Sequence, residues 1–172
     1  MAPNGTLGYD VFISEPIPLA VDAPLPNGER RMFSPLSTTL IYGSNDAVLV
    51  DPPLTTDQAA SVGDWIKASG KNVTHIVATH GHGDHWFTAG VLADRFDARV
   101  VASRGTIEQM HNNVAGREAV WDQAYPGQIP PSPERYANRQ LGATILWAGA
   151  QALYAIRDGH DTISAVVGGW LH

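Results

Sequence analysis

Runs of β-branched and apolar residues in the first half of the chain predict β-strands. Residues 37–42 and 47–50 form two such runs, joined by the turn sequence Gly-Ser-Asn-Asp, which is typical of a hairpin. Residues 73–79 are largely apolar at both odd and even positions, which face opposite sides of a sheet. This pattern is expected of a strand buried on both faces. Residues 9–14 fit a short strand, and the prolines that follow favour a place at the edge of the sheet.

Helical spacing follows the hairpin and again follows the buried strand. Thr55 and Gln58 fit a capping box at the start of a helix, and Gly70 is expected to end it. Apolar residues recur on one face of this segment, at Ala59, Val62 and Ile66. A second helix is expected over residues 86–96, followed by a short strand over residues 99–102.

The rest of the chain predicts helix, then loop, then strands. Ser103 or Thr106 is expected to cap a helix through Met110, with further helix near residues 115–124. The Pro-rich residues 125–133 predict a loop, and three short strands are expected at 143–147, 152–157 and 162–167. This order predicts a mixed α/β sheet, and 172 residues fit a single domain over residues 1–172.

Composition narrows the possible functions. The chain has no cysteine, which excludes disulfide frameworks, thiol catalysis and every zinc site that needs sulfur. Its 11 basic and 17 acidic residues give a net charge of −6 and form no basic stripe, so no nucleic-acid partner is expected. No apolar run approaches the roughly 20 residues of a membrane span, and the N-terminus lacks the pattern of a secretory signal. The expectation is a cytoplasmic protein without a membrane partner.

The candidate chemistry lies directly after the predicted buried strand. His80, His82, Asp84 and His85 occur there within six residues, a pattern expected by chance in roughly one chain in a thousand. The carboxyl end of a strand is where open α/β sheets place their ligand sites. Neutral imidazoles suit zinc, and a nearby carboxylate suits zinc, manganese or iron. A solvated His-rich loop is the alternative reading.

The segment Thr-His-Gly-His-Gly-Asp-His at residues 79–85 resembles the signature of the metallo-β-lactamase superfamily of metallohydrolases. The preceding hairpin, the strand that ends at Asp51 and the following helix agree with that family over residues 37–102. The later sequence Asp-Gly-His-Asp-Thr, around His160, resembles the family element that supplies a third histidine. The resemblance implies an αββα sandwich made of two similar halves.

The resemblance also implies a set of metal ligands. His80, His82 and His160 would hold one zinc ion and leave a fourth position for water, as in catalytic zinc sites. Asp84 and His85 would face a second metal, and manganese or iron are alternatives to zinc. Asp51 would lie beneath the site and orient a ligand. Asp51 and Asp84 are thus the catalytic candidates, although Asp51 has the alternative role of capping a turn, and His160 that of an ordinary loop histidine.

The family's second half is expected to supply a bridging Asp and a final His, and this chain ends at residue 172, shortly after His160. We therefore expect a sandwich that lacks most of its second half, one tightly held zinc, and a second metal site that is weak or absent. The implied function is a zinc-dependent hydrolase of a small ester, thioester or lactone that uses metal-activated water. The alternatives are a degenerate, non-catalytic metal-binding protein and a truncated remnant of a longer hydrolase.

The shortened chain also bears on assembly. Half of a sandwich would expose a sheet face that the other half normally covers, and residues 143–170 supply many apolar side chains. A homo-oligomer in which a second copy covers this face is therefore expected. The other expected partner is a small-molecule substrate.

Overall fold

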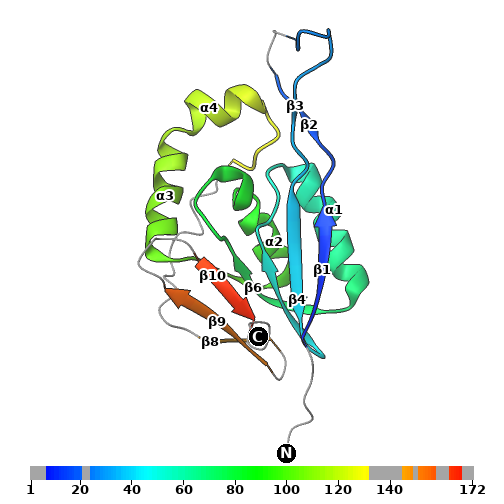
Figure 1. Ribbon diagram of the computed structural model, residues 1–172, viewed down its shortest axis with the longest axis vertical. Helices are drawn as coiled ribbons and strands as arrows, with labels where there is room; N and C mark the ends of the chain where they lie inside the picture. The colour runs from blue at the N-terminus through cyan, green and yellow to red at the C-terminus, as the bar shows by residue number, and fades with distance from the viewer. Residues whose placement is uncertain (1–6, 21–23, 132–144, 149–150, 158–162, 168–172) are drawn as a thin grey trace, which may run out of the picture.

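A main sheet organises the protein in a computed structural model that describes residues 7–20, 24–131, 145–148, 151–157 and 163–167 (Figure 1). It has five strands, in the spatial order β1 (Gly8–Ile13), β4 (Ser37–Tyr42), β5 (Asp46–Val50), β6 (Asn72–Val77) and β7 (Arg99–Val101). The strands β1, β4 and β5 pair antiparallel, whereas β5, β6 and β7 pair parallel. The predicted hairpin and buried strand are confirmed, and β1 lies at the sheet edge as expected.

Two helices, α1 (Thr56–Ser69) and α2 (Ala89–Phe96), pack on one face of this sheet (Figure 1). Phe12 of β1 meets Trp65 of α1 with ring centroids 5.5 Å apart. The predicted capping box is present, because the Thr55 hydroxyl accepts a hydrogen bond from the Gln58 amide and the Gln58 side chain accepts one from Thr55. Gly70 ends α1 in the left-handed conformation, with φ at 68°.

The core extends over both faces of the central strands. Leu49 and Ile76 are fully buried on the helix side, and Val48 and Val77, which alternate with them, are buried on the opposite side. A second, smaller sheet contains β8 (Ile145–Ala148), β9 (Gln151–Arg157) and β10 (Ile163–Val167), and β8 lies next to β5. These strands match the three that the sequence predicts. The mixed α/β fold class is confirmed.

The region after the buried strand differs from the prediction. A 3₁₀ turn spans Gly83–His85, and α2 begins at Ala89 rather than at Trp86. The reason is burial: Trp86, Phe87 and Thr88 are fully buried, and the Thr88 hydroxyl donates to the carbonyl of Pro53. These side chains hold the segment in a tight turn against the core, so the regular helix starts only after them.

Two helices and a short ribbon complete the described structure. The predicted helical stretch after β7 is divided into α3 (Arg104–Ala115) and α4 (Arg117–Ala124), which meet at Gly116. The Ser103 side chain caps α3 by accepting from the Thr106 amide. β2 (Ile17–Pro18) and β3 (Met32–Phe33) pair antiparallel near α4 (Figure 1). In the described part of the chain, no helix has the length and apolar character needed to cross a bilayer.

The central strands should dominate the stability of the fold. Ile76 is fully buried in β6, whereas Ile13 in the edge strand β1 is 57% exposed. Ile76→Ala should reduce the free energy of unfolding by about 2–5 kcal/mol, because it removes buried methylene groups and leaves a cavity. The matched change Ile13→Ala should cost about 1 kcal/mol or less. Urea unfolding measures both, and equal losses would contradict this view of the core.

Candidate functional site

The site is built where two parallel strands end side by side. Val50 of β5 pairs with Val77 of β6, so the residues that follow the two strands leave the sheet at the same edge. The amide of Asp51 still donates to the carbonyl of Val77, at 2.9 Å. This pairing brings Asp51 and Thr79 together although 28 residues separate them in the chain.

Asp51 is held in an unusual backbone conformation, with φ at 52°, a left-handed value that aspartate tolerates better than most residues. Its carbonyl accepts a hydrogen bond from the Thr38 hydroxyl at 2.8 Å. Its carboxylate accepts two more, from the Thr79 amide and from the Thr79 hydroxyl, both at 2.8 Å. The carboxylate is therefore fixed in place by β4 and by the segment that leads to His80.

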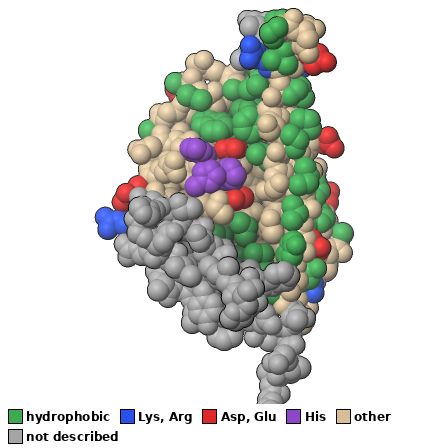
Figure 2. Space-filling view, viewed as in Figure 1, with side chains coloured by type: hydrophobic (Ala, Val, Ile, Leu, Met, Phe, Trp, Pro, Cys, Tyr) green, Lys and Arg blue, Asp and Glu red, His purple; other side chains and the backbone are tan. Residues whose placement is uncertain are grey.

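Three imidazoles gather above this carboxylate. The ring centroids of His80 and His82 are 4.8 Å apart, and those of His80 and His85 are 4.0 Å apart. Figure 2 shows histidine side chains together on one face of the molecule, beside acidic side chains. His82 is exposed, whereas His80 and His85 are half-buried. The structure thus brings the three histidines of the motif together.

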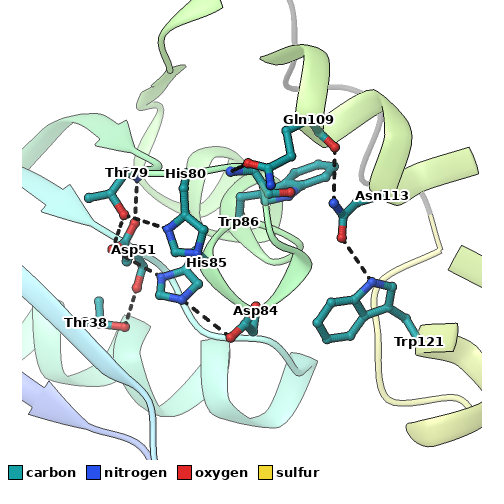
Figure 3. A network of polar contacts seen from close by, with 11 residues as sticks. Thr38, Asp51, Thr79, His80, Asp84, His85, Trp86, Gln109, Asn113 and Trp121 are labelled. Carbon is teal, nitrogen blue, oxygen red and sulfur yellow. Dashed lines mark hydrogen bonds and ion pairs between the residues drawn. The ribbon is translucent and has the colours of Figure 1, made fainter. Parts of the chain in front are cut away.

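The Thr79 hydroxyl determines which nitrogen of His80 carries the proton. This hydroxyl donates its own hydrogen to Asp51, and its oxygen lies 3.1 Å from Nδ1 of His80 (Figure 3). Nδ1 of His80 is then the donor in this pair, a tautomer assigned from the hydrogen-bond network. Nε2 of His80 is left with a free lone pair, which is the state that a metal ligand requires.

His85 lies between two carboxylates. Its Nδ1 is 3.2 Å from Oδ2 of Asp51, and its Nε2 is 3.4 Å from Oδ2 of Asp84. Nδ1 of His85 is buried, and its contact with Oδ2 of Asp51 lacks the alignment of a full hydrogen bond. The two groups therefore form an ion-pair contact. Asp84 and Asp51 are only 15% and 16% exposed, which strengthens both contacts relative to surface pairs.

The glycines of the motif are required by packing. Gly81 and Gly83 are not among the positive-φ residues of the described chain, so backbone conformation is not the reason for glycine here. A Cβ on Gly81 would lie 2.7 Å from the carbonyl oxygen of Thr106, in α3. A Cβ on Gly83 would overlap the ring of Phe87. Both positions therefore need glycine because other groups approach the backbone closely.

Burial and neighbouring charges shift the pKa values of two site histidines in opposite directions. Burial lowers the pKa of His80, and positive charge on His85 or His82 lowers it further, against the opposing effect of Asp51 and Asp84. Burial alone would also lower the pKa of His85, but the contact with Asp51 and the charges of Asp51 and Asp84 outweigh it and raise this pKa. The site therefore favours neutral His80, which is the form that binds metals.

Aromatic residues pack around the loop and do not all face solvent. Trp86 and Phe87, which directly follow the histidine motif, are fully buried and serve packing. Trp121 of α4 meets Phe87 with ring centroids 5.4 Å apart and stacks on Tyr125. Burial, followed by the charge of Asp84, raises the pKa of Tyr125 to about 12, so its hydroxyl stays protonated at neutral pH.

The donor set fits a metal only in part. The 3.4 Å between Nε2 of His85 and Oδ2 of Asp84 is close to the separation of two ligands on a tetrahedral zinc ion, roughly 3.3 Å for bonds of about 2.0–2.1 Å. Among the described residues, however, no three His, Asp or Glu side chains are arranged to hold one ion. His160, the expected third histidine, lies outside the described residues. The ligand set stays a prediction.

Two positions of the site have no role in the sequence reading. Thr79 connects Asp51 to His80, and Gln109 of α3 accepts a hydrogen bond from the Gly81 amide at 2.9 Å. Thr79 adjoins the motif and follows a strand, which is a local signal. Gln109 has no such signal, because its place depends on how α3 packs. The other two described histidines, His75 and His111, are a half-buried strand residue and an exposed helix residue.

Comparison with known proteins gives a matching family model and a partial match to a curated protein. The family model of the metallo-beta-lactamase superfamily matches residues 32–168. A metal-dependent hydrolase of Methylobacterium nodulans is 42% identical over 57 residues, which are 33% of this chain and 24% of that protein. The chain therefore matches only about a quarter of this curated relative's length.

Solved structures support the same fold. A metallo-beta-lactamase of Cronobacter sakazakii superposes with a TM-score of 0.55 at 25% identity, over 76% of this chain and 49% of that one. A beta-lactamase domain protein of Burkholderia ambifaria, 20% identical, has a TM-score of 0.57 over 92% of this chain and 49% of that one. The second likeness concerns the fold alone. In both, the chain spans about half of the other protein.

The role of Asp51 can be tested through the pKa of His85 in metal-free protein. Asp51→Asn should lower this pKa, because it removes the charge that raises it. A raised folded-state pKa means that protonated His85 stabilises the fold below its unfolded-state pKa of about 6.5, a contribution lost as pH rises through the folded-state pKa. Asp51→Asn should therefore cost more stability near about pH 5.5 than near about pH 9.

Two measurements check this prediction. NMR titration follows the His85 ring directly, and urea unfolding at the two pH values gives the free energy of unfolding. Asp57→Asn, an acidic residue in the first turn of α1, is the matched control and should leave the His85 titration unchanged. An Asp51→Asn loss that is the same at both pH values would show that Asp51 acts on the fold without acting on His85.

Proposed function

The chain belongs to the metallo-beta-lactamase superfamily, and on this premise we propose that it is a zinc-dependent hydrolase of a small ester, thioester or lactone. The observation that carries the proposal is the group of three imidazoles, His80, His82 and His85, above the half-buried carboxylate of Asp51. Its position, where β5 and β6 end, is where open α/β sheets bind ligands.

The proposed metal ligands are His80, His82 and His160 for one zinc ion, and Asp84 and His85 for a weaker second site. When bound, zinc would supply Lewis acidity that polarises the scissile carbonyl and lowers the pKa of water. The Thr79 contact orients His80 with Nε2 free, and burial keeps its imidazole neutral. Both effects support metal binding, and manganese or iron remain alternatives in such a site.

Asp51 and Asp84 have different proposed tasks. Asp51 is tied to Thr79 by two hydrogen bonds and lies against Nδ1 of His85, so it would orient His80 through Thr79 and His85 directly. Asp84 lies on the other side of His85 and close enough to Tyr125 to raise its pKa. Because the two Thr79 hydrogen bonds fix the carboxylate of Asp51 rather than that of Asp84, Asp84 is the carboxylate proposed to exchange protons during hydrolysis.

Two observations favour a non-catalytic alternative. The chain spans about half the length of the structures that it resembles, and among the described residues no three donors are arranged around one ion. A degenerate member that binds one metal for structure, or a remnant of a longer hydrolase, would have these features. Metal content and turnover separate these readings.

We expect about one tightly held zinc ion per chain, because three imidazoles and a water complete a tetrahedral site whereas two protein ligands do not. His80→Ala should remove the metal and lower hydrolysis of p-nitrophenyl acetate, acetylthiocholine or γ-butyrolactone by more than about 100-fold. Asp84→Ala should retain most of the zinc while it loses activity. Elemental analysis and initial rates measure the two effects.

His111→Ala is the matched control, since it removes an exposed imidazole from α3, and it should change neither property. Zinc without turnover of any of the three substrate classes would favour the non-catalytic alternative. A chain that takes up no zinc, even when zinc is supplied, would contradict both readings.

We also propose that the chain forms a homo-oligomer. The side chains of residues 143–170, on which this expectation first rested, lie outside the described ones. Support comes from β1, where Tyr9, Val11 and Ile13 alternate along one face and are 63%, 47% and 57% exposed. Such a row of apolar side chains on an edge strand favours association.

Light scattering at micromolar concentration should give a mass that is a multiple of 18.4 kDa. Val11→Lys should shift the protein toward the monomer, because a charge on an edge strand opposes pairing. Val120→Lys, a matched change at an exposed position of α4, should leave the mass unchanged. A clean monomer for the unmodified chain would contradict the proposal.

A further inference from the structure

The peptide groups on both sides of Gly81 are held by side chains from other parts of the fold. The Gly81 amide donates to Oε1 of Gln109 at 2.9 Å, and the Gly81 carbonyl accepts from Nε1 of Trp86 at 3.0 Å. Gly81 is buried and separates His80 from His82. Any movement of this residue would therefore move both imidazoles.

The helix α3 packs directly against this point. The Cβ of Gln109 and the backbone of Met110 approach so closely that a Cβ on Gly81 would lie 2.5 Å and 2.8 Å from them. The backbone of Gln109 is held in turn, because the Asn113 side chain donates to the backbone carbonyl of Gln109 at 3.2 Å. The same Asn113 side chain accepts a hydrogen bond from Nε1 of Trp121 at 3.2 Å (Figure 3). A continuous set of contacts thus runs from α4 through α3 to the loop of histidines.

We propose that Gln109 is a positioning residue that fixes the backbone between His80 and His82, and so fixes the placement of their imidazoles for one metal ion. The inference rests on the proposed metal-dependent function. Its physical basis is that a buried amide without a hydrogen-bond acceptor costs free energy. The position of the Gly81 amide is therefore determined by the Gln109 side chain that accepts its hydrogen bond. Gln109 itself is not proposed as a ligand.

Different atoms of Gln109 make the hydrogen bond to Gly81 and the packing contact with Gly81, so substitutions can remove one and keep the other. The part of Gln109 that packs against Gly81 is its Cβ, whereas the bond to the Gly81 amide is made by the terminal Oε1. Gln109→Met keeps the length and the packing and removes the acceptor. Gln109→Glu keeps the acceptor oxygen. Glu108→Met makes a similar polar-to-apolar change at an exposed neighbour, where only a surface ion pair with Arg104 is lost.

The experiment uses two readouts on the full chain. The first is the affinity for cobalt(II), measured by the visible absorption of the bound ion. The second is the hydrogen-exchange rate of the Gly81 amide in metal-free protein, measured by NMR. The exchange rate reports the Gln109–Gly81 bond without any metal, so it does not depend on the proposed function.

Gln109→Met should weaken cobalt binding by about 10- to 100-fold, as is usual when a group that orients metal ligands is lost. It should also speed exchange of the Gly81 amide at least about 10-fold, because the amide loses its acceptor. Gln109→Glu should restore both properties toward the unmodified values, and Glu108→Met should change neither. If Gln109→Met does not fold, Gln109→Ala, whose side chain carries no hydrogen-bond acceptor, repeats the comparison.

Different failures have different meanings. If the unmodified chain binds cobalt and Gln109→Met binds it equally well, the inference is wrong and the proposed function stands. If Gly81 exchange is unchanged in Gln109→Met, the inference is wrong whatever the metal does. If the unmodified chain binds no cobalt at all, the proposed function falls and the positioning role falls with it.

Discussion

The site depends on the contacts that the Asp51 carboxylate makes with Thr79 and His85. This carboxylate accepts two hydrogen bonds from Thr79 and lies against Nδ1 of His85, while the Thr79 hydroxyl in turn meets Nδ1 of His80. One half-buried carboxylate thus orients two imidazoles, His85 directly and His80 through the Thr79 hydroxyl. The left-handed backbone of Asp51 and the hydrogen bond from Thr38 keep that charge at the end of β5.

The same charge explains why the clustered histidines differ in their protonation. Three imidazoles in contact cannot all be charged at low cost, because like charges at such distances repel. Burial and the positive charge of His85 or His82 lower the pKa of His80, whereas Asp51 and Asp84 raise that of His85. The result is one imidazole that favours the neutral form beside one that favours the charged form. A metal cation held by Asp84 and His85, as proposed, would take the place of the proton on Nε2 of His85, while Nδ1 stays beside Asp51.

Packing from the helices defines the loop as firmly as the polar contacts do. Gly81 has room only for hydrogen because α3 lies against it, and Gly83 has room only for hydrogen because the ring of Phe87 does. Trp86 is fully buried and uses its indole nitrogen to hold the Gly81 carbonyl. The backbone of the motif therefore has its conformation because the aromatic side chains and α3 occupy the space on either side of it.

The sequence by itself determined the local elements and the place of the chemistry. Strand periodicity located the hairpin and β6, and the Thr55–Gln58 capping box located the start of α1, because these signals act between residues near in the chain. The spacing of His80, His82, Asp84 and His85 after a buried strand was equally local. The tertiary structure alone decided the rest: that α2 begins only at Ala89, that Asp51 meets His85, and that Gln109 meets Gly81. These contacts join residues about 28 to 34 positions apart, and side-chain burial and helix packing, which no local pattern encodes, bring them together.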